Sequence, residues 1–180
     1  MMAAFVSFLP LIVLMIASRL LPRRIALLAS LGIAILTLVP WLLGSGTPKQ
    51  FSLVLAMLIA ANVVWNFAHE TSAERWSGVL ISGGIAVYAL ATLALGHPFA
   101  EQWAHERVPE QFWTNPTTIH IVTAITWVWA AIYVVLFALG FPRERWMPSP
   151  RTRSLISIVL VVAGIAFTSW YPGFVAGGPR

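Results

Sequence analysis

The chain contains no cysteine and no aspartate, and only 9% of its 180 residues are charged. The lack of cysteine excludes disulfide bonds, thiolate metal ligands and cysteine nucleophiles. The lack of aspartate excludes a Ser-His-Asp triad. The sequence also has no G-x-S-x-G elbow, no P-loop and no dinucleotide fingerprint. We therefore expect no enzymatic activity and no catalytic residue.

The chain is rich in apolar residues, since 59% of it is hydrophobic. A soluble domain carries about a quarter charged residues, so this balance is typical of an integral membrane protein. The net charge of +5 comes almost entirely from arginine, since Lys49 is the single lysine. These arginines cluster in short segments beside apolar runs. The pattern predicts contact with lipid phosphate and no binding of nucleic acid.

Six apolar runs lie at about 4–21, 25–43, 51–68, 77–95, 118–140 and 154–172. Each is close to the roughly 20 residues that a helix needs to cross a bilayer. The pattern predicts an all-α, polytopic membrane helix bundle with about six transmembrane helices. Five spans remain if one run is re-entrant. No stretch suits a separate soluble domain, so we expect one integral membrane domain over residues 1–180.

Basic residues are distributed unevenly between the two ends of these runs. With six spans, one side carries eight basic residues: Arg19, Arg23, Arg24, Arg75, Arg143, Arg145, Arg151 and Arg153. The other side carries three: Lys49, Arg107 and Arg180. The positive-inside rule places the richer side in the cytoplasm. We therefore expect a multi-pass protein of the bacterial inner membrane, with both chain ends and the segment 97–116 in the periplasm.

Four polar residues share one face of the third apolar run. Asn62, Asn66, His69 and Glu70 stand at i, i+4, i+7 and i+8. Polar groups at membrane depth face the interior of a bundle, because they need partners there. One interpretation is a path for protons or a ligand that opens toward the cytoplasm. The one we favour is interhelical hydrogen bonding by the two asparagines, with the other two residues in the headgroup zone.

Residues 97–116 form the longest polar stretch in the chain, and we call them the outer segment. Pro98 suits a first helical turn and Pro109 ends one, so the sequence predicts a helix over 98–108. Aromatic residues fall on one side of this helix and charged residues on the other, as in an amphipathic helix that lies in the membrane interface. The candidate residues for contact with lipid or a partner protein are Phe99, Trp103, Phe112 and Trp113.

Glu101 and His105 are the candidate functional polar residues of the outer segment, because side chains four apart on a helix can share a proton or a metal ion. A metal site needs three or four convergent ligands, and only two are placed here, so we expect none. Haem is also not expected. His69 and His120 stand at opposite ends of their helices in a six-span topology, on the order of 20–30 Å apart. We therefore predict no cofactor.

Several short motifs resemble the intracellular septation protein A family, the YciB-type inner-membrane proteins. The first is the N-terminal stretch FVSFLPL. The second is Phe67–Ala68–His69–Glu70 followed by Arg75–Trp76, and the third is Pro98 followed by VPEQFW before the fifth apolar run. The length and the order of the helices also agree. The chain departs from the family pattern at Ser7, where the pattern has an acid, and at Glu101, where the pattern has glutamine.

The resemblance implies work in the cell envelope, such as septum formation, cell division and maintenance of the inner membrane. It supplies no catalytic residues. We therefore expect a non-enzymatic inner-membrane protein that acts through contacts with lipid or other integral membrane proteins. Two alternatives stay open: an accessory transmembrane subunit of a respiratory or photosynthetic complex, and a small transporter or channel that uses the polar face of the third helix.

Overall fold

The computed structural model describes residues 2–44, 49–141 and 149–177, without the side chains of residues 2–5, 70–75, 150 and 176. The regular secondary structure of these described residues is entirely helical, with no strand, which confirms the all-α prediction. The elements are α1 (Met2–Leu20), α2 (Arg23–Leu42), α3 (Gln50–Ala68), α4 (Glu70–Ala94), α5 (Glu101–Ala104), the 3-10 turn η1 (Glu110–Phe112), α6 (Pro116–Gly140) and α7 (Pro150–Ala176).

Five of these helices are long and apolar enough to cross a membrane. The suitable segments are Arg23–Leu42, Gln50–Ala68, Trp76–Ala94, Pro116–Gly140 and Arg151–Val175. The first predicted run corresponds to α1, whose described side chains, Val6–Leu20, are also mostly apolar. Length and composition therefore define a helical, membrane-embedded protein.

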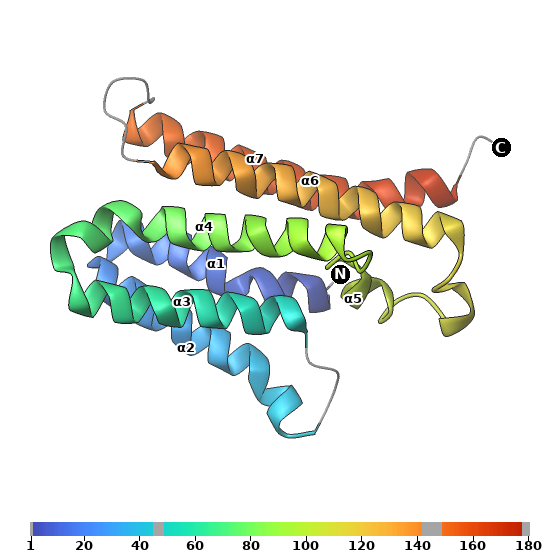
Figure 1. The fold of residues 1–180 in the computed structure, drawn as a ribbon, viewed down its shortest axis with the longest axis horizontal. Helices are drawn as coiled ribbons and strands as arrows, with labels where there is room; N and C mark the ends of the chain where they lie inside the picture. The colour runs from blue at the N-terminus through green and yellow to red at the C-terminus, as the bar shows by residue number, and fades with distance from the viewer. Residues whose placement is uncertain (1, 45–48, 142–148, 178–180) are drawn as a thin grey trace. The chain divides into compact units, whose positions relative to one another are not determined.

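The chain divides into two compact units, Met1–Gly84 and Ile85–Arg180. In the first unit α1, α2 and α3 pack side by side (Figure 1). Pro10 lies within α1 and contacts α2: its carbonyl oxygen accepts a buried hydrogen bond from the Oγ atom of Ser30 at 2.8 Å. Proline is tolerated inside an apolar helix where a neighbouring helix supplies such a contact.

The core of the first unit is built from one face of α3 and one face of α2. Phe51, Leu55 and Ile59 stand four apart on α3 and are fully buried. Ala26 and Ala34 of α2 are equally buried. Small residues let helix backbones approach closely, which is the usual means of packing helices in a membrane.

The second unit contains α6 and α7, which run side by side in opposite directions (Figure 1). Both helices begin at a side-chain cap followed by proline: the Asn115 side chain accepts from the backbone N–H of Thr117, and Ser149 accepts from that of Thr152. Such caps satisfy backbone donors that the first helical turn leaves free. The two helices are joined at Trp129, whose indole N–H donates to the Oγ1 atom of Thr168 at 2.9 Å.

The end of α4 is fixed by a glycine in the left-handed region. Gly96 has a φ of 76°, and the backbone N–H of His97 donates to the carbonyl oxygen of Thr92 at 3.0 Å. This is the geometry of a Schellman C-cap, in which glycine is favoured because it has no Cβ atom. The cap turns the chain out of α4 and places His97 at the start of the outer segment.

Candidate functional site

Asn62 and Asn66 lie inside the first unit, where they form a closed polar cluster with Ser77 of α4. The exposed fractions of these three side chains are 1%, 4% and 0%. The Asn62 amide donates to the backbone carbonyl of Ser77 at 2.9 Å, and the Ser77 hydroxyl donates to the Asn62 Oδ1 atom. Asn66 donates to the same Oδ1 atom at 2.9 Å and to the Asn62 carbonyl at 2.8 Å.

The structure therefore brings the two asparagines together as the spacing predicted. It also adds Ser77, which the sequence analysis did not single out. The residue lies 15 positions from Asn62, across the turn between α3 and α4, so no local pattern pairs the two. These hydrogen bonds join α3 to α4, and they occupy the Asn62 oxygen and amide with partners from the same chain.

His69 does not continue the polar face of α3. It is the residue that ends the helix, with a φ of −139°, and its side chain is exposed. Its ring lies 4.7 Å from the ring of Trp65, centroid to centroid. Glu70 begins α4, and its side chain lies outside the described part of the structure. Of the four residues predicted to share a face, the described side chains place only the two asparagines in one cluster.

The helix predicted over 98–108 is wrong in its extent, because α5 covers only Glu101–Ala104. Residues 98–100 form a turn before it, and the Ala104 carbonyl accepts from the backbone N–H groups of both Arg107 and Val108, which closes the chain into a second turn. The physical reason lies in burial. The aromatic side of the segment is packed into the second unit, and a short turn positions it there.

Phe99 and Trp103 are the two buried aromatic residues of the outer segment. Their exposed fractions are 1% and 8%, and their rings meet edge to face at 5.6 Å. Tyr88 of α4 approaches Phe99 at 6.1 Å, and the backbone N–H of Ala100 donates to the Thr126 Oγ1 atom of α6 at 3.4 Å. Phe99 and Trp103 are thus covered by their own chain.

Phe112 and Trp113, the other two candidate contact residues, are more accessible. Phe112 is 44% exposed, and Trp113 is half-buried. The indole N–H of Trp113 donates to the Val108 carbonyl at 2.8 Å, which holds the ring against its own loop. Of the four aromatic residues, Phe112 therefore offers the largest free surface.

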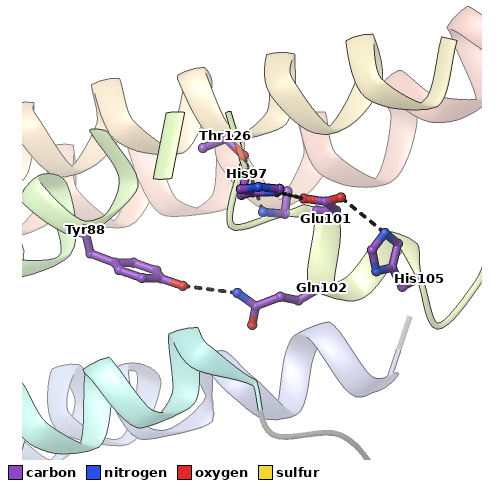
Figure 2. A network of polar contacts seen from close by, with 7 residues as sticks. Tyr88, His97, Glu101, Gln102, His105 and Thr126 are labelled. Carbon is purple, nitrogen blue, oxygen red and sulfur yellow. Dashed lines mark hydrogen bonds and ion pairs between the residues drawn. The ribbon is translucent and has the colours of Figure 1, made fainter. Parts of the chain in front are cut away.

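Glu101 lies between two histidines (Figure 2). One carboxylate oxygen is 3.4 Å from the Nε2 atom of His105, and the other is 3.7 Å from the Nδ1 atom of His97. Glu101 and His105 are about one-third exposed, whereas His97 is 83% exposed. The His105 ring is stacked on Trp113 with 3.9 Å between the centroids and 21° between the planes. The stacking partner was not predicted from the sequence.

A further polar contact ties the outer segment to α4. The Gln102 amide donates to the hydroxyl of Tyr88 at 3.1 Å (Figure 2). Gln102 and Tyr88 lie 14 residues apart, on either side of the α4 cap, and no local sequence signal pairs them. Within the described part of the chain, no three His, Cys, Asp or Glu side chains are grouped so that they could hold a metal ion.

No family model matches the chain, and neither a curated protein nor a solved structure shows significant similarity to it. The class of protein is therefore defined by the fold alone: a helical, membrane-embedded protein with five helices suited to span a bilayer. The motifs that resemble the septation family remain a similarity of short sequence stretches.

Proposed function

We propose that this chain is a non-enzymatic membrane protein that acts by helix contact with another integral membrane protein. The observation that carries the proposal is the exposed apolar surface of α7. Only 6% of the apolar window of α7 is buried, compared with 39% for its neighbour α6. Few residues of α7 are fully buried, and its exposed residues are available to lipid or to a partner helix.

The exposed residues of α7 follow the spacing of a helical face. Leu155, Val159 and Val162 stand at i, i+4 and i+7, and they are 58–64% exposed. Helices in a membrane associate by van der Waals packing along such a face. Farther along the helix, the exposed Trp170 ring stacks on the exposed Phe174 ring at 4.8 Å between centroids. Aromatic residues near a helix end suit the interface between membrane and water.

The uneven distribution of basic residues supports an inner-membrane location with six spans. In this arrangement α1 crosses the membrane as the sixth span, and the outer segment lies in the periplasm. Arg143 and Arg145 contribute to the cytoplasmic count from outside the described residues, as does Arg180 to the periplasmic count. Reporter fusions at residues 22 and 107 test this orientation, because only the second should give a periplasmic signal.

The narrower proposal is a role in the cell envelope, through septation or maintenance of the inner membrane. It rests on the motifs near the N-terminus, at the end of α3 and in the outer segment that resemble the septation family. If the partner belongs to a respiratory or photosynthetic complex, the chain would instead be an accessory subunit that contacts this complex through the same surface of α7. The identity of the partner therefore separates these two roles.

A transporter that uses the polar face of α3 is the second candidate from the sequence. Asn62 and Asn66 are closed against each other and Ser77, so passage of a solute would require these hydrogen bonds to open. The buried cluster therefore favours a packing role for the two asparagines. Flux of protons or small solutes into sealed proteoliposomes, lost on Asn66→Leu, would support the transporter.

Photocrosslinking in intact membranes tests the proposed contact. A photoreactive residue at Val159 should give a discrete protein adduct, which mass spectrometry then identifies. The matched control is Val122 of α6, which is 5% exposed and should react only within its own chain. If Val159 yields lipid adducts alone at the native expression level, the proposed partner contact at α7 is refuted.

A further inference from the structure

Three side chains of the outer segment form a cluster with His105 at its centre, although two turns of the chain separate Glu101 from Trp113. Glu101 is in α5, His105 follows α5, and Trp113 follows η1. His105 contacts both of the others: its Nε2 atom is 3.4 Å from the Glu101 carboxylate, and its ring is stacked on the Trp113 indole. We call these three residues the clasp.

Each side of the clasp is anchored independently of His105. On one side, α5 is anchored by the buried rings of Phe99 and Trp103. On the other side, Trp113 is anchored by the hydrogen bond from its indole N–H to the Val108 carbonyl. Val108 itself donates to the Ala104 carbonyl of α5, so the backbone already connects the two parts, and His105 adds a side-chain contact between them. A change in its charge changes how firmly they are joined.

We propose that the clasp is a pH-dependent device that fastens the outer segment when His105 is protonated and loosens it when the proton is lost. Both partners favour the charged ring. A carboxylate attracts an imidazolium but not a neutral imidazole, and an indole face attracts a cation stacked on it. Histidine is the side chain whose charge changes between about pH 5 and 8, and the orientation proposed above places the outer segment in the periplasm.

The other positive charges near the clasp oppose this effect only weakly. A charged His97 would compete with His105 for the Glu101 carboxylate, but it lies farther away, at 3.7 Å, and is 83% exposed, so its effect is smaller. The remaining charged side chains of the segment, Glu106, Arg107 and Glu110, are exposed. The elements of the second unit that pack around the segment bring little charge: α6 carries only His120, and α4 carries none beyond Gly84.

The direction of the effect follows from this arrangement. The ion pair requires a charged imidazole ring, so a lower pH favours the pair and a higher pH disfavours it. The outer segment is then most strongly held at pH 6 and most loosely held at pH 8. Because Glu101 and His105 are each about one-third exposed, the effect is that of a partly solvated ion pair, about two- to fivefold in the local opening equilibrium.

Hydrogen–deuterium exchange of the full-length protein in nanodiscs tests the proposal. After correction for the intrinsic pH dependence of exchange, peptides that cover residues 101–113 should exchange about two- to fivefold faster at pH 8 than at pH 6. His105→Gln should abolish the difference between the two pH values, and Glu101→Gln should reduce it. In each variant the new side chain is close in size to the original one. The matched control is His120→Gln, since His120 bonds to Tyr171 and lies outside the clasp.

Tryptophan fluorescence provides a second readout that does not depend on exchange. A protonated imidazole in contact with an indole quenches its emission, so Trp113 should be dimmer at pH 6 than at pH 8. The difference between wild type and Trp113→Phe isolates this ring from the other eight tryptophans of the nine in the chain. Exchange that is equally pH-dependent in wild type and His105→Gln, or Trp113 emission that does not change with pH, would overturn the proposal.

Discussion

Replacement of Asn62 with alanine removes the centre of the buried cluster between α3 and α4. Three hydrogen bonds are lost with the side chain: one to the Ser77 carbonyl, one from the Ser77 hydroxyl and one from the Asn66 amide. Two of these bonds join α3 to α4, and the bond from Asn66 lies within α3. A hydrogen bond between transmembrane helices contributes on average about 0.6 kcal/mol. We therefore expect Asn62→Ala to lower the free energy of unfolding by about 1–2 kcal/mol.

The assay is unfolding in mixed micelles by titration with a denaturing detergent, followed by circular dichroism. The matched control is Val64→Ala, on the same helix two residues away, where the side chain is 68% exposed. A substitution at such a surface position changes stability by at most about 0.5 kcal/mol. Both variants shorten one side chain of α3 to a methyl group, so the difference between them reports the buried bonds.

A double-mutant cycle with Ser77→Ala separates the direct bond from other consequences of the substitution. The coupling energy between Asn62 and Ser77 should lie between about 0.6 and 1.7 kcal/mol, the range of interhelical hydrogen bonds in membrane proteins. A coupling energy indistinguishable from zero, together with equal losses for Asn62→Ala and Val64→Ala, would refute the reasoning that this cluster joins the two helices.

Two glycines give further predictions in the same assay and in hydrogen exchange. In Gly164→Ala the new Cβ atom would lie 2.7 Å from Ile132 and 3.2 Å from the Trp129 ring, so we expect a loss of about 1–3 kcal/mol. Gly32→Ala is the control, since no atom lies within 4 Å of its new Cβ atom, and helix propensity should make it neutral or stabilising by up to about 1 kcal/mol. Gly96→Ala places a Cβ atom at a φ of 76°, which costs about 1–2 kcal/mol and should speed exchange at residues 97–104. Unchanged exchange there would argue against the left-handed cap.

The positions of the long helices could be predicted from the sequence because the signal is local. A run of about 20 apolar residues can satisfy its backbone in a bilayer only as a helix, so composition alone gives the element and its approximate ends. The spacing of Asn62 and Asn66 also gave their common face. Their partner could not be predicted in this way. Ser77 lies on another helix, and the register of two packed helices depends on side-chain contacts along both.

The outer segment shows where local patterns stop being informative. The sequence correctly predicted that Phe99 and Trp103 lie on one side of the segment, and that Glu101 and His105, four residues apart, lie close together. The pattern could not tell whether lipid or the chain itself would cover the aromatic side. Tyr88 of α4 approaches Phe99, and Thr126 of α6 accepts from the backbone N–H of Ala100. Because these contacts hold the segment with Phe99 buried, a long interfacial helix is not needed to cover the ring. The same tertiary contacts fix the polar side in place, so His105 meets Trp113 across a turn. His105, which spacing alone marked as half of a possible metal site, thus contacts both Glu101 and Trp113.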